Sequence, residues 1–313
     1  MMSMNSNRCA IFIFLLLISF DVRSFANEND SLSLFENSPT PLKKRVHLLN
    51  YTVAGLYPTT MTWLYTQWYK DYPQTTFHFF NDNSEWLQMD KFGHFWDAYS
   101  IAKPLTHLYR WTGYSNKKST YLACGIAFMF QTTVEVFDGF SSEWGFSTGD
   151  VMCNTGGVLL FGAQQLLWEE QRFTLKYSFS QSKYSRYRPN LLGSNLPENI
   201  LKDYNGLTYW LCVNPYSFMS KESKFPKWLN FALGFGADGM TGGKENPSSV
   251  DGHPIPSFER RRQFYLALDV DLAKINTGSK FVNGFFKLIN IVHIPAPAVE
   301  INSRGVVWRG LAF

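Results

Sequence analysis

Residues 148–180 read TGDVMCNTGGVLLFGAQQLLWEEQRFTLKYSFS, and the pattern of the chain changes inside this stretch. Up to Trp168 the residues are mainly apolar, which is typical of a helix within a domain core. From Arg172 to Ser180, aromatic and aliphatic residues alternate with polar ones, which is the period of two that a half-buried strand requires. The stretch therefore joins a helical region to a β-rich region.

The helical pattern extends from this point toward the N-terminus. Long apolar runs separated by turn-forming residues predict helices at 46–69, 90–111, 119–138 and 148–168. Pro58 and Pro104 fall inside two of them, and we expect each to kink or divide its helix because proline lacks an amide donor. Residues 46–170 are therefore predicted to form an apolar bundle of about four helices.

The alternating pattern extends toward the C-terminus. Similar runs are separated by polar or Gly-rich loops, and they lie at 207–213, 228–235, 263–272, 284–293 and 305–313. Residues 171–313 are therefore predicted to form an antiparallel, β-rich region, and the fold class is α+β. The aromatic strands and the final Phe313 resemble outer-membrane barrel proteins, although the smallest such barrels need about 8 strands. A membrane-embedded sheet and a soluble sheet packed on the helices both remain open.

The N-terminus predicts export. A basic start, an apolar run from Ile11 to Ile18 and small residues up to Ala26 form a secretory signal peptide over 1–26. An exposed N-terminal segment is expected over 27–45. Cys9 precedes the apolar run, so the sequence does not match the lipobox of a lipoprotein. The mature protein is therefore expected in the periplasm or at the outer membrane.

The composition limits the classes of partner that the protein is expected to bind. A net charge of +4 is too mild to indicate a nucleic-acid-binding protein. The aromatic content of 17% suits apolar cores and bilayer interfaces, where one end of a ring is in water. We therefore expect a membrane lipid or a cell-wall component as the partner.

Polar side chains interrupt three of the predicted helices at helical spacing, and each set falls on one helix face. Because the links are short, successive helices should run antiparallel, which brings the three sets to one end of the bundle. The predicted polar cluster, which would bind the ligand, comprises Asp90, Lys91, His94, Glu135, Asp138, Ser147, Asp150 and Asn154.

Three interpretations of this cluster are open. The spacing of Ser147 and Asp150 is that of a capping box, and such a network can be purely structural. Glu135 and Asp138 lie at a helix C-terminus, where negative charge costs about 0.3–1 kcal/mol, so a cation should compensate them. The same groups suit general acid–base catalysis. They also suit a divalent metal such as magnesium, calcium or manganese, with candidate ligands Asp90, His94, Glu135, Asp138 and Asp150.

The ordered motifs resemble a known pattern. DKFGHF at 90–95, EVFDG at 135–139 and STGD at 147–150 followed by Asn154 are similar to VanZ-like proteins. They are closer still to a bacterial family of unknown function described as periplasmic lipoproteins, in particular to its Bacteroidetes-type members. The resemblance is best over 85–168, and it implies a location at the cell surface and no particular activity.

The sequence predicts an exported, membrane-associated envelope protein that binds a lipid or cell-wall head group at the polar cluster. One alternative is a membrane hydrolase or transferase that depends on a divalent metal, and another is an outer-membrane structural protein. The sequence contains no H-E-x-x-H or P-loop motif, so whether the protein is an enzyme stays open.

Overall fold

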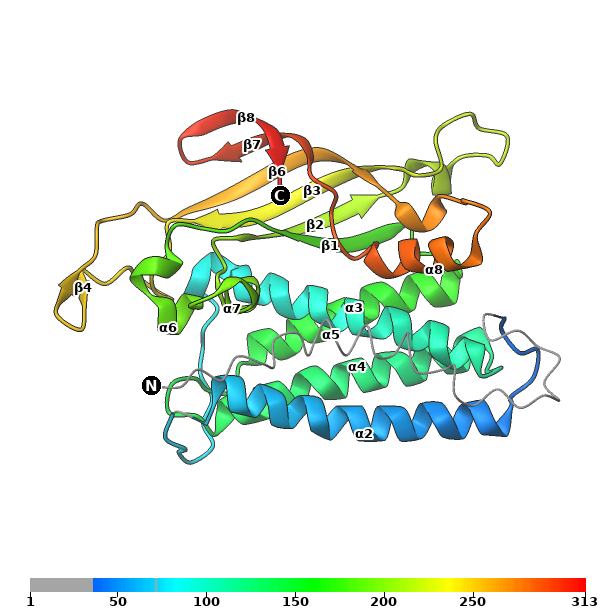
Figure 1. Cartoon of the computed structure of the whole chain (residues 1–313), viewed down its shortest axis with the longest axis horizontal. Helices are drawn as coiled ribbons and strands as arrows, with labels where there is room; N and C mark the ends of the chain where they lie inside the picture. The colour runs from blue at the N-terminus through cyan, green and yellow to red at the C-terminus, as the bar shows by residue number, and fades with distance from the viewer. Residues whose placement is uncertain (1–35, 71) are drawn as a thin grey trace. The chain divides into compact units, whose positions relative to one another are not determined.

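The computed structural model describes residues 36–70 and 72–313. The predicted signal peptide over 1–26 and the first part of the predicted segment 27–45 lie outside the described residues. The chain forms two units, which are drawn in Figure 1. The helical unit contains the described residues up to Asn81 together with Asp97–Glu169, and the sheet unit contains Asp82–Trp96 and Glu170–Phe313.

The four predicted long helices are present. They are α2 (Lys43–Trp68), α3 (Met89–Trp111), α4 (Asn116–Gly139) and α5 (Thr148–Leu167). Pro58 and Pro104 lie inside α2 and α3, and each helix continues past its proline, so of the expected kink or division the division does not occur. Proline can be tolerated inside a long helix when packing of the surrounding turns offsets the one lost hydrogen bond.

Helices α4 and α5 run antiparallel within the helical unit. At one end, the amide of Asn116 donates to the backbone oxygen of Gln165 at 2.8 Å, and Gln165 donates back to the Asn116 side chain at 2.7 Å. At the other end, the backbone amide of Ser147 donates to Glu135 at 3.2 Å. The end of α4 and the start of α5 therefore meet, as the short link between them predicts.

The sheet unit is built on one antiparallel sheet. Its strands follow the order β1 (Phe173–Phe179), β2 (Leu207–Val213), β3 (Leu229–Asp238), β6 (Arg261–Val270), β7 (Ala296–Asn302) and β8 (Gly305–Ala312). A small hairpin of β4 (Ser249–Val250) and β5 (His253–Pro254) lies in the loop before β6. The predicted α+β class and the antiparallel sheet are confirmed.

The remaining elements of the sheet unit are short. The helices are α6 (Pro189–Leu192), α7 (Leu196–Lys202) and α8 (Lys280–Ile289), and the 3-10 turns are η2 (Glu85–Gln88), η3 (Ser185–Tyr187), η4 (Pro215–Phe218) and η5 (Leu272–Lys274).

The predicted strand at 284–293 is wrong, because most of this stretch belongs to helix α8. Ser279 caps the helix by accepting from the amide of Val282 at 3.4 Å. Phe281 and Phe285 recur at a spacing of four, which is helical and places both on one face. The actual strand is β7, where Pro295 and Pro297 obscured the alternating pattern.

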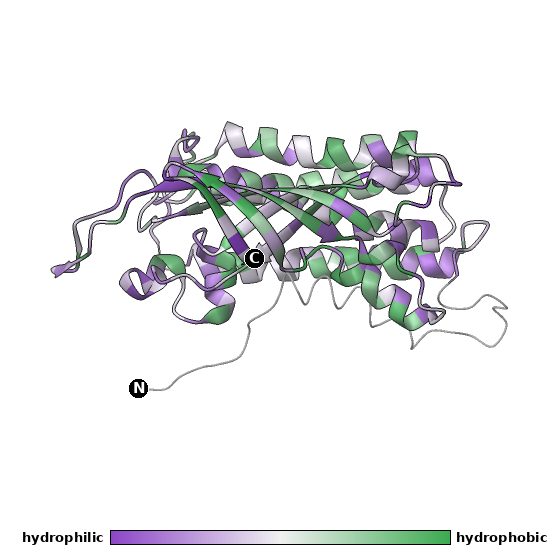
Figure 2. Cartoon of the chain, turned by 90° about the horizontal axis from the view of Figure 1, so that it is seen from above, coloured by the Kyte–Doolittle hydropathy of each residue, from purple (hydrophilic) through white to green (hydrophobic). Residues whose placement is uncertain are grey.

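The two faces of the sheet differ in polarity, and Figure 2 shows hydrophilic and hydrophobic residues alternating along the strands. The polar face carries Lys176 and Asp269, both fully buried, whose charged atoms lie 2.8 Å apart. Glu300 is also fully buried there and pairs with Arg309 at 2.6 Å. The other face is apolar and about half exposed on β3, β6, β7 and β8, where it presents Phe231, Leu233, Phe264, Leu266, Leu268, Ile301, Val306 and Trp308.

Cross-strand partners form a continuous row on the polar face: Lys176, Trp210, Gly234, Tyr265 and Glu300. A Cβ atom on Gly234 would lie 2.7 Å from the Trp210 ring, so this close approach requires glycine. His293 stacks on the same indole, with ring centroids 3.9 Å apart. The buried side of the sheet is therefore closely packed around Trp210.

Candidate functional site

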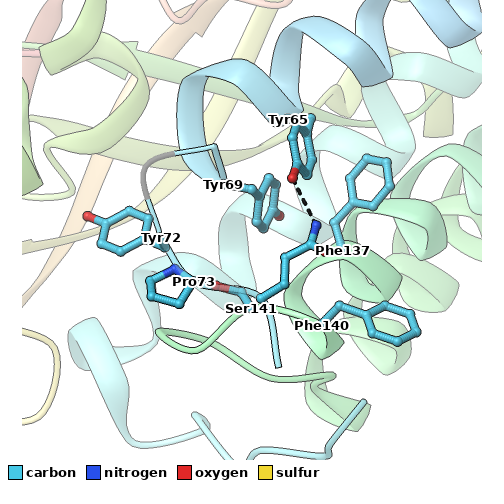
Figure 3. A pocket seen from close by; sticks show the side chains of 8 residues that line it. Tyr65, Tyr69, Tyr72, Pro73, Phe137, Phe140 and Ser141 are labelled. Atoms are coloured by element: carbon cyan, nitrogen blue, oxygen red, sulfur yellow. Dashed lines mark hydrogen bonds between the residues drawn. The ribbon is translucent and has the colours of Figure 1, made fainter. Parts of the chain in front are cut away.

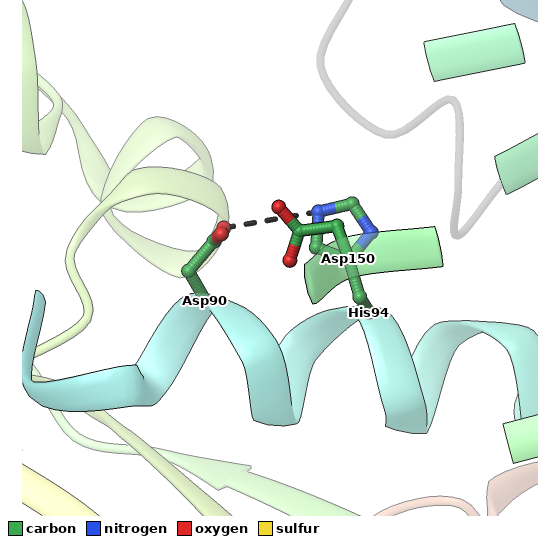
Figure 4. Close-up of side chains that lie close together, drawn as sticks. All are labelled: Asp90, His94 and Asp150. Atoms are coloured by element: carbon green, nitrogen blue, oxygen red, sulfur yellow. Dashed lines mark ion pairs between the residues drawn. The ribbon is translucent and has the colours of Figure 1, made fainter. Parts of the chain in front are cut away.

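Asp90 is the centre of a set of polar contacts at the start of α3, in the sheet unit. The hydroxyl of Tyr204 donates to Asp90 Oδ1 at 2.6 Å, and Lys91 Nζ lies 3.3 Å from Asp90 Oδ2. His94, one turn along the same helix face, places Nε2 3.9 Å from Asp90 Oδ1 (Figure 4). Lys91 also pairs with Asp82 at 2.6 Å. Lys91 thus contacts both carboxylates, and His94 lies close to Asp90.

These charges shift the titration of Asp90. Burial by itself would raise the pKa of Asp90, but His94, Lys91 and the Tyr204 hydroxyl outweigh it and bring this pKa below its ordinary value. Asp90 is therefore a stable anion near neutral pH. Glu85 behaves in the opposite way, because burial raises its pKa more than Lys244 lowers it.

A strained turn positions Asp90. Three consecutive residues directly before α3 have left-handed backbone angles, with φ of 46° at Trp86, 51° at Leu87 and 71° at Gln88. Such angles cost about 1–2 kcal/mol for each residue that is not glycine. The turn is held by a backbone bond from Trp86 to Gly243 at 2.8 Å and by Arg262 Nε, which donates to Gln88 at 3.0 Å. Local strain kept in place by surrounding contacts is a feature of functional sites.

A second set of polar residues lies in the helical unit, where α4 ends and α5 begins. Glu135 is 1% exposed and accepts a hydrogen bond from the backbone amide of Ser147. The Ser147 hydroxyl in turn accepts from the amide of Asp150 at 3.2 Å, which caps α5 as the spacing predicts. Asp150 and Asn154 are 2% and 0% exposed. Ser147 thus connects the buried Glu135 carboxylate to the backbone amide of Asp150.

The hairpin between α4 and α5 is fixed by a neighbouring segment of the helical unit. The backbone of Phe146 donates to His78 at 2.9 Å and accepts from Phe80 at 3.1 Å. A Cβ atom on Gly145 would lie 2.5 Å from Phe80, so glycine is required for this approach. Residues 139–147 are therefore held along residues 74–80.

Asp138 faces an aromatic environment. The hydroxyl of Tyr69 donates to Asp138 Oδ1 at 2.8 Å. The Tyr69 ring also contacts Phe137 and Trp144, with centroids 5.7 Å and 5.6 Å apart. This phenol is a partner of Asp138 that the sequence did not predict.

The structure thus places the predicted residues in two sets. The sheet unit holds Asp90, Lys91 and His94 together, and the helical unit holds Glu135, Ser147, Asp150 and Asn154 near one another, with Asp138 one helical turn beyond Glu135. Sequence reasoning missed Tyr204 and Asp82 as partners of the first set. The only signal for Tyr204 was the polar stretch at 202–206, because a hydrogen bond across 114 residues leaves no local pattern.

The chemistry of both sets favours a ligand with charge. Carboxylate oxygens and one imidazole nitrogen suit hard divalent cations, and the same carboxylates accept hydrogen bonds from an ammonium group. Lys91 and His94 add donors for an anionic group such as phosphate. The residues can therefore bind a cation or the opposite charges of a zwitterion.

The comparison with known proteins is consistent with an exported protein. Residues 78–163 match the model of a family described as "Predicted periplasmic lipoprotein (DUF2279)". No curated protein and no solved structure matches the chain significantly. The matched stretch contains all eight residues of the predicted polar cluster. Residues 78–163 are therefore similar to a periplasmic lipoprotein family of unknown function, which fits an exported protein of the cell envelope.

Proposed function

We propose that this exported protein associates with a membrane of the cell envelope and binds a lipid or cell-wall head group with its polar cluster. The observation that carries the proposal is the burial of Glu135 and Asp150, connected through Ser147, at the ends of two apolar helices. The finer resemblance to VanZ-like proteins, which also points to the cell surface, is part of this proposal.

Burial of carboxylates needs an explanation, because a charge moved out of water costs several kcal/mol unless it is compensated. A purely structural role is better served by apolar side chains of similar size, which often stabilise a protein more than a buried ion pair does. Buried charges retained at a helix junction are therefore candidates for ligand binding.

The sheet unit supports membrane association. Its apolar face exposes large side chains, among them Trp308 at 69% and Val306 at 72%, and contiguous apolar surface of this kind is typical of interaction sites. Helix α8 exposes Phe281 and Phe285 on one side and carries lysines at both ends, the pattern of a helix that lies at a membrane surface. Among the described residues, only α4 is long and apolar enough to cross a membrane, and on its own this is weak evidence.

The proposal is tested by calorimetric titration with dihexanoyl phosphatidylethanolamine below its micelle concentration and with soluble peptidoglycan fragments. We expect one of the two probes to bind, and Glu135→Gln and Asp150→Asn to weaken it about tenfold, the loss of one hydrogen bond to a charged group. Glu143→Gln, an exposed carboxylate in the neighbouring hairpin, is the matched control and should bind like wild type. Equal affinity of all four proteins would contradict the proposal.

A second candidate is a hydrolase or transferase that depends on a divalent metal. It is favoured by the geometry of Asp90 and His94, whose ligand atoms lie 3.9 Å apart while Tyr204 orients the carboxylate. Of the ligands that the sequence predicts, Asp90 and His94 lie together in the sheet unit, and Glu135, Asp138 and Asp150 belong to the helical unit. Mass spectrometry of purified wild-type protein should then find a stoichiometric amount of metal. Asp90→Asn and Asp138→Asn should each lower this amount. Wild-type protein purified without metal would exclude this candidate.

A further inference from the structure

The helical unit contains an aromatic cavity of about 340 Å³. Its walls come from the end of α2, the segment after it and the end of α4, and they comprise Tyr65, Tyr69, Tyr72, Pro73, Gln74, Phe137, Phe140 and Ser141 (Figure 3). The volume falls within the usual range of small-molecule sites, about 300–1,000 Å³. None of these side chains is charged, and most are aromatic.

Tyr65 and Tyr69 lie nearly parallel, at 21° with centroids 6.0 Å apart, and the Phe137 ring stands across both of them. The Phe137 ring meets Tyr65 at 75° and Tyr69 at 67°, with centroids 6.0 Å and 5.7 Å away. Trp144 supports Tyr69 and Tyr72 from behind, at 73° and 80° to them. Aromatic residues that surround one hollow suit a compact cation, whereas a sugar ring stacks on a flat aromatic platform.

The polar groups of the cavity add negative potential. Tyr69 donates its hydroxyl to Asp138, so a carboxylate lies one hydrogen bond behind the cavity wall. The Tyr65 hydroxyl is occupied by the amide of Gln74 at 2.8 Å, which fixes this ring in place. Electron-rich aromatic faces attract ammonium groups within about 6 Å of the ring centroid, and a neighbouring carboxylate strengthens the attraction.

A second hollow extends the cavity. It has a volume of about 420 Å³, it is lined by Tyr57, Pro58, Met61, Thr62 and Thr133, and it shares Tyr65 and Phe137 with the first. Its surface is largely apolar. A molecule with an ammonium group in the first hollow can therefore place an apolar portion in the second.

We propose that the aromatic cavity between α2 and α4 binds a substituted ammonium group, with Tyr65, Tyr69 and Phe137 as the cage and Asp138 as the counter-charge. The ammonium group can belong to a lipid head group or to a small soluble amine. This site is additional to the head-group site proposed above, although Asp138 belongs to both sets.

The first experiment compares two ligands of nearly equal shape. Choline chloride and its uncharged analogue 3,3-dimethylbutan-1-ol are titrated into the full protein, and binding is followed by saturation-transfer NMR of the methyl protons. We expect choline to bind about tenfold more tightly than the alcohol, because only choline gains from the aromatic faces and Asp138. Equal affinity, or preference for N-acetylglucosamine over choline, would overturn the proposal.

Substitutions in the cavity wall test where choline binds. Tyr65→Leu and Phe137→Leu each remove one wall and should weaken choline binding about two- to thirtyfold. Tyr51→Leu is the matched control, because Tyr51 lies on the same helix at 74% exposure and away from the cavity. Choline affinity that is unchanged in both wall variants would exclude this cavity, and circular dichroism verifies that each variant is folded.

Two further measurements distinguish a lipid from a soluble amine as the ligand, and the ammonium site from the head-group site. If dihexanoyl phosphatidylcholine binds more tightly than phosphocholine, and Met61→Ser removes the difference, the second hollow holds an acyl chain and the source is a lipid. If choline fails to bind while Glu135→Gln still weakens the head-group probe, this inference fails and the proposed function stands. If choline binds and Glu135→Gln has no effect on either head-group probe, the aromatic site stands and the polar-cluster function fails.

Discussion

At the scale of single residues, the clearest consequence of burial is the titration of His293. The side chain is fully buried, stacked on Trp210 and close to the pair of Lys176 and Asp269. Burial lowers the pKa of His293, Asp269 opposes this and Lys176 adds to it, and together they bring the pKa from 6.5 to about 4. The neutral imidazole is therefore the form that the folded sheet unit accommodates.

This shift predicts a pH dependence of stability. Between pH 6.5 and about 4 the unfolded chain binds a proton at His293 that the folded chain does not, so stability should fall as the pH drops through this window. The loss from this group is on the order of 3 kcal/mol. Urea unfolding at pH 7 and pH 4.5 measures it. His293→Phe keeps the stacked ring and removes the titration, and it should flatten the pH profile; an unchanged profile would contradict this account.

At the scale of elements, Ser147 connects local structure to the proposed site. Ser147→Ala removes the cap of α5 and should cost about 1 kcal/mol in the free energy of unfolding. Ser115→Ala removes the equivalent cap of α4, where Ser115 accepts from Lys118 at 3.3 Å, and should cost a similar amount. We expect only Ser147→Ala to weaken head-group binding. If the two variants bound the head group equally, the cap of α5 would have no role in the head-group site.

The elements also show what the sequence could predict and why it fell short. The four long helices follow from apolar runs bounded by turn residues, and β1 follows from strict alternation of side chains. Helix α8 was missed because a short apolar run fits either period. The left-handed turn at Trp86–Gln88 has no signal, because these residues rarely adopt such angles and only tertiary contacts hold them there.

The candidate site could also be predicted only in part from the sequence. Residues at helical spacing, such as Asp90 and His94, could be placed on one face from the sequence alone. The link from Glu135 to Ser147 followed from the short hairpin between two helices. The contact of Tyr69 with Asp138 could not be foreseen, because it depends on how two distant helices pack against each other.

At the scale of the whole molecule, the sheet differs from an ordinary soluble sheet in what it buries and in what it exposes. Its buried face carries ion pairs, and its apolar face is partly open to the surroundings. We expect the protein to float with phosphatidylethanolamine and phosphatidylglycerol vesicles in a density gradient. Leu266→Glu should reduce the bound fraction severalfold, because it introduces a charge into the apolar face.

The control for this experiment is Leu196→Glu on α7, since Leu196 and Leu266 have the same exposure of 52%. Leu196 lies outside the apolar face, so this variant should float like wild type. If both variants behaved like wild type, the apolar face would have no role in membrane association.

The grouping of Asp82–Trp96 with the strands has a practical consequence for dividing the protein into fragments. Met89 belongs to the apolar core against β2 and β3, and Phe92 stacks on Phe235 with centroids 4.2 Å apart. A fragment that starts after α5 would therefore lose one wall of its own hydrophobic core and expose Phe235 to water. Separate expression of the strand-rich part requires that this early helical turn be supplied in trans or fused ahead of β1, much as a missing strand is restored in a split protein.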